Sequence, residues 1–326
     1  WATVKGYRGS YLTAYNNGDY GVYAFDAVDG VLDHSYATGS PDAGFYIGQC
    51  YPCDAIVNNV VSEYNGLGYS GTNSGGSLYI TSSIFRNNKG GLAPNTLDSE
   101  LLPPERETFI IGNLIENNNN YNSPATNATY LSYGNGVVIA GGNNNIIKNN
   151  VIVDHDLYGV ILTASMDVNY WPAHGNRVEE NLILSSRKAD IAVSGVSNLA
   201  NCFEGNYFNT SIPPGLQALN GCEKNIIPLS ADLSGLWSTI ARLIYANTGD
   251  FYQDDWRTLP APEQQDNMPI MQEIIDANDN GQYELGFYQY LPSFRNSVKP
   301  AVNVYEDYKY TLKGVQLPQE AIKYLN

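Results

Sequence analysis

The stretch Gly44–Gly66, GFYIGQCYPCDAIVNNVVSEYNG, contains the pattern from which the fold of this chain can be predicted. It begins with a glycine and a short apolar strand, and it continues to asparagines that stand between pairs of β-branched residues. Similar segments begin as GVYAFDA at Gly21, GVVIAGG at Gly136, GVILTAS at Gly159 and DIAVSGV at Asp190. A pattern that recurs in this way predicts a protein built from structural repeats.

A second signature follows each opening strand, for example NNVV at Asn58 and NNVI at Asn149. The repeats are about 24 to 37 residues long and contain short strands. This length is too great for the repeat of a hairpin meander, and the apolar residues lack the period of α-helical repeats. Each repeat fits one coil of a parallel β-solenoid, in which an asparagine at the same bend of each coil stacks on its neighbours and bonds unpaired backbone groups. The polar residues that we align at this bend are Asn59, Ser83, Asn113, Asn150, Asn181 and Asn206.

The alternation within the opening strands predicts the core. We expect the following residues to point inward and stack from coil to coil: Val22, Phe45, Ile47, Val137, Ile139, Val160, Leu162, Ile191 and Val193. The outward pairs are then Tyr23/Phe25, Tyr46/Gly48, Val138/Ala140, Ile161/Thr163 and Ala192/Ser194. Because none of these is charged, this face supplies neither paired carboxylates for glycoside hydrolysis nor a base and a cation for polyuronate chemistry.

These repeats, together with the segments DAGFYIGQC and NCFEGNYFNTS, resemble the right-handed parallel β-helix proteins of the pectate-lyase-like superfamily, particularly NosD-like and carbohydrate-binding/sugar-hydrolase repeat proteins. The resemblance covers residues 18–222. It implies an all-β, right-handed parallel β-helix. It implies no single function, because that superfamily includes lyases, hydrolases, epimerases and non-enzymatic binders.

The charge balance excludes several classes of partner. Seventeen basic against 33 acidic residues give a net charge of −16, which repels nucleic acids and anionic membrane surfaces. The same charge disfavours polyuronates unless divalent cations bridge the two. The sequence also contains no apolar run of about 18 residues that would predict membrane insertion.

The cysteines predict an oxidising compartment. Four of them allow two disulfides, which we expect between Cys202 and Cys222 and between Cys50 and Cys53. No second C-x-x-C and no thioredoxin-like pattern accompany Cys50 and Cys53, so a zinc site or redox motif is not indicated. The first residue is Trp1, as expected if a leader has been removed. We therefore expect a secreted, periplasmic or cell-surface protein.

Two regions are predicted. Residues 1–225 form the parallel β-helix, with about seven coils. Residues 226–326 form a helical cap and an extended Tyr-rich tail packed on the solenoid, since an open solenoid end exposes its core. The cap helix is indicated by apolar residues at helical spacing: Leu233, Leu236, Trp237, Ile240, Leu243 and Ile244.

The candidate catalytic residues lie in the segment DHDLY. Asp154, His155, Asp156 and Tyr158 supply a histidine between carboxylates with a nearby tyrosine, which suits acid/base chemistry of a lyase or epimerase. The alternative is a solvated turn, where Asp and His are ordinary residues.

The candidate ligand-binding residues are aromatic. Tyr23, Phe25 and Tyr46 fall on the outward face of adjoining coils, in a chain with 26 tyrosines. Such rings stack against sugars and also form protein interfaces. The alternative is scattered surface aromatics on strands that favour them.

A candidate calcium loop reads DANDNGQYE. Asp276, Asn278 and Asn280 occupy the first, third and fifth positions of an EF-hand-type loop, and Glu284 the ninth. The twelfth position is Phe287 instead of a bidentate glutamate. Ca²⁺ therefore competes with the alternative of a helix end turned by Asn and Gly.

Together these features favour a β-helix that binds a glycan or a protein surface. A polysaccharide lyase or epimerase is the first alternative. A structural subunit that assembles into a surface layer, filament or larger complex is the second.

Overall fold

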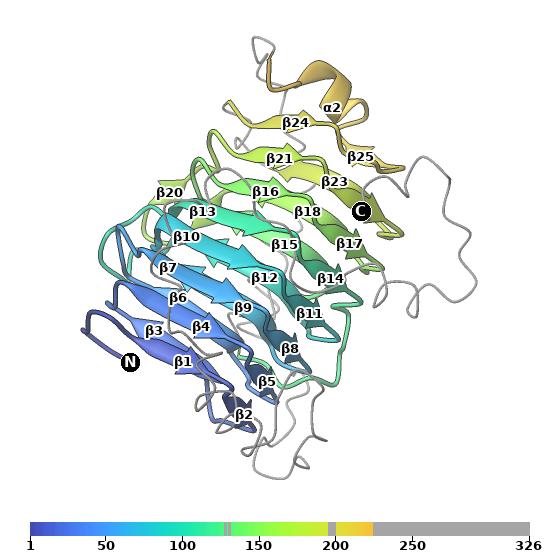
Figure 1. Cartoon of the computed structure of the whole chain (residues 1–326). Helices are drawn as coiled ribbons and strands as arrows, with labels where there is room; N and C mark the ends of the chain where they lie inside the picture. The colour runs from blue at the N-terminus through green and yellow to red at the C-terminus, as the bar shows by residue number, and fades with distance from the viewer. Residues whose placement is uncertain (127–128, 130–131, 195–199, 224–326) are drawn as a thin grey trace, which may run out of the picture.

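The computed structural model describes residues 1–126, 129, 132–194 and 200–223. Over this part the chain winds into a parallel β-helix, in which a coil contributes one strand to each of three sheets (Figure 1). Sheets 1 and 3 have eight strands each and sheet 2 has seven, so the described chain makes eight coils. The predicted parallel β-helix is confirmed. The predicted cap and tail, residues 226–326, lie outside the described residues.

Each strand of a sheet is hydrogen-bonded to the equivalent strand of the next coil. Sheet 1 contains β1 (Arg8–Ser10), β4 (Gly30–Asp33), β7 (Ala55–Asn58), β10 (Gly75–Thr81), β13 (Arg106–Ile111), β16 (Ile146–Lys148), β21 (Arg177–Glu179) and β24 (Cys202–Glu204). Sheet 2 contains β2 (Thr13–Tyr15), β5 (Tyr36–Thr38), β8 (Val61–Glu63), β11 (Ile84–Arg86), β14 (Leu114–Glu116), β17 (Val151–Val153) and β22 (Leu182–Leu184). Sheet 3 contains β3 (Val22–Phe25), β6 (Ala43–Gly48), β9 (Leu67–Thr72), β12 (Gly90–Asn95), β15 (Asn135–Ala140), β18 (Tyr158–Thr163), β23 (Ala189–Ser194) and β25 (Ser211–Ile212).

Three smaller elements complete the described fold. β19 (Ser165–Met166) and β20 (Tyr170–Trp171) pair antiparallel after β18, and the short helix α2 (Leu216–Leu219) follows the last coil. Both predicted disulfides are present. Cys50–Cys53 follows β6, and Cys202–Cys222 joins β24 to the segment after α2.

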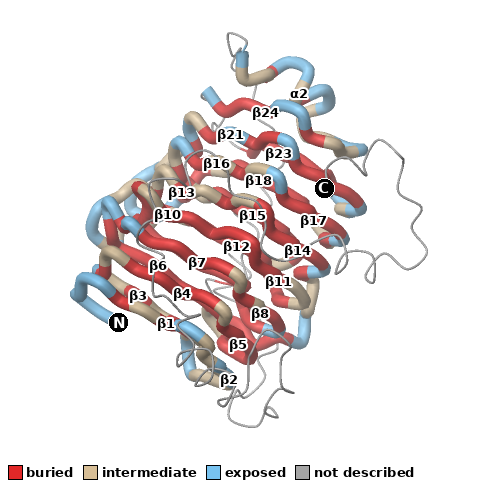
Figure 2. Tube along the Cα trace, in the orientation of Figure 1, coloured by how far each residue is buried: buried red, intermediate tan, exposed pale blue. Residues whose placement is uncertain are grey.

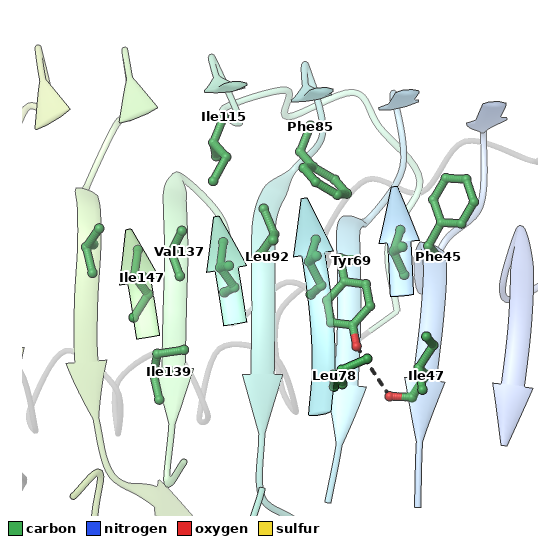
Figure 3. Close-up of a cluster of buried hydrophobic side chains, with 14 of the residues drawn as sticks. Phe45, Ile47, Tyr69, Leu78, Phe85, Leu92, Ile115, Val137, Ile139 and Ile147 are labelled. Carbon is green, nitrogen blue, oxygen red and sulfur yellow. Dashed lines mark hydrogen bonds between the residues drawn. The ribbon is translucent and has the colours of Figure 1, made fainter. Parts of the chain in front are cut away.

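Most residues of the three sheets are buried (Figure 2), and the core lies between the sheets, where buried side chains from successive coils stack in rows (Figure 3). All nine residues predicted to point inward belong to this buried cluster. In Figure 3, Val137 and Ile139 lie on one strand and face Ile147, with Phe45 and Ile47 further along the stack. The predicted register is therefore confirmed, and its outward pairs form the outer face of sheet 3.

Close contact between adjacent coils explains why most of the repeats open with a glycine. A Cβ on Gly21 would lie 2.5 Å from the carbonyl oxygen of Gly44, and one on Gly136 would lie 2.5 Å from that of Gly159. At Gly21 and Gly136 the backbone of the adjacent coil therefore approaches too closely for a side chain. The repeat after that of Gly159 has Asp190 at this position instead of glycine. The carboxylate of Asp190 accepts hydrogen bonds from the backbone N–H groups of Asn209 and Thr210.

An asparagine ladder fills the bend between sheets 1 and 2. Each Nδ2 of Asn113, Asn150 and Asn181 donates to the side-chain oxygen of the next coil, at 2.9–3.0 Å. Ser83 is in register with these residues, and so is Val60. The alignment of Asn59 was wrong by one residue. Asn59 instead has φ of 54° beside the ladder, a conformation that asparagine tolerates better than most residues.

Two further ladders occupy the other bends. Between sheets 2 and 3, Asn65, Asn88 and Asn118 bond in sequence, and His155 ends the series. Between sheets 3 and 1 the ladder is formed by Asn145, Asn176 and Asn201. All three bends of the coil are therefore closed by buried amides whose hydrogen bonds repeat from coil to coil.

Candidate functional site

The outer face of sheet 3 brings together the aromatic residues of its first two coils. Tyr23 and Phe25 of β3 stack with ring centroids 5.8 Å apart, and Tyr23 stacks on Tyr46 of β6 at 4.9 Å. The parallel register places Tyr23 directly opposite Tyr46, so the contact follows from the repeat itself. The three predicted aromatic residues therefore form one cluster. Their role in binding stays a prediction.

Tyr20 is a fourth member that sequence reasoning missed. Its ring centroid lies 4.8 Å from that of Tyr23 and 4.7 Å from that of Tyr46. It precedes β3, in a turn that lies outside the repeat pattern, so no period pointed to it. The rings of Tyr20, Tyr23 and Phe25 are half-buried, whereas Tyr46 is 1% exposed and forms the floor of the cluster.

A carboxylate reaches this face from a distant loop. The hydroxyl of Tyr46 donates to both oxygens of Glu100, at 2.8 and 3.0 Å. The loop between β12 and β13 that carries Glu100 is fixed on both sides. Asn73 Nδ2 donates to the carbonyl of Glu100 at 2.9 Å, and Leu101 N donates to Gln49 Oε1 at 2.8 Å. The outward strand residues are uncharged, as predicted, but the loop adds a charge to their face.

Two more carboxylates flank the rings. Asp19 and Asp42 are linked through their backbones, because Asp42 N donates to the carbonyl of Asp19 at 2.9 Å. Burial raises the pKa of Asp42 to about 7, the charge of Asp19 adds to this, and a hydrogen bond from Tyr20 opposes it. Burial also raises the pKa of Glu100 and of Asp19. We call the set Asp19, Tyr20, Tyr23, Phe25, Asp42, Tyr46 and Glu100 the aromatic–carboxylate cluster.

The cluster combines two kinds of contact. The half-buried rings offer apolar faces for stacking, and the carboxylates accept hydrogen bonds from hydroxyl or amino groups. Burial disfavours the charged form of each carboxylate. A hydrogen-bond donor on a ligand would stabilise that charged form.

The predicted catalytic histidine lies inside the coil. His155 is 1% exposed, its Nδ1 accepts from Asn118 N at 3.4 Å, and its Nε2 lies 3.3 Å from the carbonyl of Ile115. Burial lowers the pKa of His155 to about 4, so the ring is neutral at physiological pH. Asp154 is exposed at the adjoining turn. The structure therefore does not bring His155 to the surface with the carboxylates of this segment.

The other two predicted catalytic residues adjoin a surface cavity of about 360 Å³. Asp156 lines it and accepts from Tyr133 Oη at 2.8 Å and from Arg187 Nη1 at 3.1 Å. Lys188, also in the lining, lies with Nζ 5.0 Å from the ring centroid of Tyr158. We call the lining residues Tyr133, Asp156, Leu157, Arg187 and Lys188 the Asp156 pocket.

Sequence reasoning missed most of the Asp156 pocket, because its residues come from separate coils. Tyr133 precedes β15, Asp156 precedes β18, and Arg187 precedes β23. A signal was nevertheless present, since all three stand a few residues before equivalent strands of sheet 3 and the repeat superimposes such positions.

The calcium prediction, on Asp276, Asn278, Asn280 and Glu284, falls outside the described residues. In the part of the chain that the structure describes, the one group of three residues close enough to share a metal ion is Glu179, Cys202 and Cys222. The two sulfurs of this group form a disulfide, so they are not free thiolates. No helix among the described residues is long and apolar enough to cross a membrane.

Comparison with known proteins gives matches among solved structures. No family model matches the chain, and neither does any curated protein sequence. The A-module of mannuronan C-5 epimerase AlgE4 from Azotobacter vinelandii is 18% identical over 70% of this chain and 57% of that one, with a TM-score of 0.46. The periplasmic alginate epimerase AlgG is 13% identical over 65% of this chain and 47% of that one, with a TM-score of 0.43.

The chain thus spans about half the length of these solved structures. The identities and TM-scores are too low to transfer a substrate or a catalytic residue to this chain.

Proposed function

We propose that the chain is a glycan-binding β-helix and that the aromatic–carboxylate cluster is its binding surface. The observation that carries the proposal is the contact of four aromatic rings, three of them half-buried, beside three carboxylates on one face. A sugar ring would stack on Tyr23 or Phe25 through its apolar C–H face. Its hydroxyl groups would donate to Glu100 and Asp42.

The cluster is preformed, which favours binding. Its rings stand on paired strands, and the loop of Glu100 is anchored to Asn73 and Gln49. A ligand therefore has little side-chain or loop entropy to remove on binding. The two disulfides support a secreted, periplasmic or cell-surface location, where glycans are accessible.

The charge of the cluster restricts the ligand. Three carboxylates at the site and a net charge of −16 repel polyanions. Neutral or cationic glycans are therefore the expected partners, and polyuronates are not.

A glycan array followed by calorimetric titration of the best ligand tests the proposal. Tyr23→Ala should weaken binding at least about tenfold, because a stacked ring contributes on the order of 1–3 kcal/mol. The matched control is Tyr15→Ala, which removes an exposed tyrosine from β2 on a different sheet. Equal affinities of wild type and Tyr23→Ala for every ligand found would reject the proposal.

The Asp156 pocket favours a second candidate function, a polysaccharide lyase or epimerase. The specific observation is that Arg187 and Lys188 stand beside Asp156, Tyr133 and Tyr158, in a protein that is otherwise strongly acidic. Cations neutralise a substrate carboxylate, and tyrosine or aspartate exchanges a proton. Assays on alginate and pectate should then show turnover that Lys188→Ala reduces at least about a hundredfold. Turnover unchanged by Lys188→Ala would count against this candidate.

A further inference from the structure

The carboxylates of the aromatic–carboxylate cluster stand outside the ion pairs of the described residues. Those pairs involve Arg8, Arg86, Lys148, Arg177, Arg187 and His34 as the cationic partners. None of these pairs within the described chain includes Asp19, Asp42 or Glu100. The charged groups that act on Asp42 are Asp19 and Glu100 themselves. No cation of the described chain neutralises these carboxylates, so a positively charged ligand would stabilise their ionised forms.

The three carboxylates of the cluster are not gathered around a single point. A metal ion needs several oxygens around one point. The three carboxylates do not form such a group, since the one candidate group in the described chain lies at Glu179. Carboxylates spread over a ring surface instead suit an organic cation, whose charge and body are distributed.

The rings support the same conclusion independently of the acids. Tyr20, Tyr23 and Phe25 present half-buried aromatic surface, and an ammonium group is attracted to the face of such a ring within about 6 Å of its centroid. Glu100 is oriented by Tyr46, which holds the carboxylate against the floor of the cluster. A group that carries both an ammonium and an apolar ring face would use the rings and the acids together.

From this combination we infer that the cluster selects glycans that carry free, protonated amino groups. The inference rests on the proposed glycan-binding function and names its substrate class. The ammonium group donates to Glu100 and Asp42, while the sugar ring stacks on Tyr23. An N-acetylated sugar offers the same ring but only a neutral amide, so it loses the charge-assisted hydrogen bonds.

The test compares two ligands that differ only in the acetyl group. Affinities for a chitosan oligosaccharide and for the chitin oligosaccharide of the same length are measured by calorimetry at about pH 7, where the amine is still partly protonated and Asp42 is partly ionised. The free amine should bind at least about tenfold more tightly. This preference should shrink as salt is raised from about 0.05 to about 0.5 M, because ions screen the charges.

Variants locate the preference. Glu100→Gln and Asp42→Asn should each weaken the amine ligand several-fold more than the acetylated one. The control is Glu107→Gln, which removes a carboxylate that contacts Tyr51 away from the cluster. It should leave both affinities unchanged. Melting curves of all variants verify that they are folded.

The outcomes separate the inference from the proposal beneath it. Equal binding of both oligosaccharides, abolished by Tyr23→Ala, would overturn the amine preference and leave the glycan-binding function standing. Binding of neither oligosaccharide, nor of any other glycan, would overturn both. Tighter binding of an oligolysine peptide than of the amine oligosaccharide would overturn the inference in favour of a basic protein partner.

Discussion

The polar residues inside the bends and those on the outer face of sheet 3 differ in how well their neighbours satisfy their polar groups. In the ladders, each buried amide finds its partner in the next coil, as Asn113, Asn150 and Asn181 do. In the aromatic–carboxylate cluster, Asp42 and Glu100 are partly buried beside like charges, and their pKa values are raised. The ladder residues therefore serve the fold, whereas the cluster carries a local electrostatic cost that a bound ligand would offset.

The largest expected effect comes from placing a charge on the wrong side of sheet 3. Ile139→Asp buries a carboxylate in the stacked apolar core and should lower the free energy of unfolding by more than about 4 kcal/mol. Ala140→Asp, its neighbour on the half-buried outer face, should cost far less. Thermal melts followed by circular dichroism measure both. Similar losses for the two variants would contradict the register.

Much of this interior follows from the sequence. The period-two alternation and the recurring glycine are local signals, so the core residues and their register were predictable. The ladder at Asn113 and Asn150 was predictable for the same reason. Asn59 was misplaced, because the pairing of Val61 with Ile84 puts Val60 in register with Ser83, and the sequence pattern alone does not reveal that this coil has an apolar residue at the ladder position.

The outer face was less predictable. The stacking of Tyr23 on Tyr46 follows from the repeat, since strands of adjacent coils pair in register. Glu100 and Tyr20 lie in connections outside that period, and only the folded loops bring them to the face. The sequence around His155 is typical of a surface turn, but this residue occupies the ladder position of Asn118 in the next coil. Its neighbours in space decide this, not its neighbours in sequence.

The second prediction removes one rung of a ladder. Asn150→Ala deletes the acceptor of Asn113 N and the donor to the carbonyl of Ile110, so it leaves buried backbone groups unpaired. The expected loss is about 2–3 kcal/mol in the free energy of unfolding. Chemical denaturation measures it.

The control for this variant is Asn59→Gly. Asn59 stands beside the ladder with a positive φ that glycine adopts freely, so its substitution should change stability by less than about 1 kcal/mol. If Asn59→Gly destabilised the protein as much as Asn150→Ala, the assignment of the ladder to Asn150 and its equivalents would be wrong.

The third prediction concerns a substitution that should stabilise the protein, whereas the first two should destabilise it. The pKa of Asp42 is about 7 in the folded protein, against about 4 in an unfolded chain. The folded state therefore holds a proton that the unfolded state has released. The contribution of Asp42 to stability consequently falls as pH rises from about 4 to about 7, and it changes little above that range.

Asp42→Asn removes this penalty. Its melting temperature should exceed that of wild type near pH 8, on the order of 2 °C, and the difference should vanish near pH 4. Scanning calorimetry across this pH range measures it. A variant that melts below wild type at pH 8 would show that the carboxylate serves the fold, as the ladder amides do.

The most direct test of the central claim, that the aromatic–carboxylate cluster is the binding surface, is a parallel titration of two variants with one amino oligosaccharide. Tyr23→Ala alters the cluster, and Lys188→Ala alters the Asp156 pocket, which is the other candidate site. We expect a dissociation constant at least about tenfold higher for Tyr23→Ala and an unchanged one for Lys188→Ala. An unchanged constant for Tyr23→Ala, with weakening confined to Lys188→Ala, would contradict this claim.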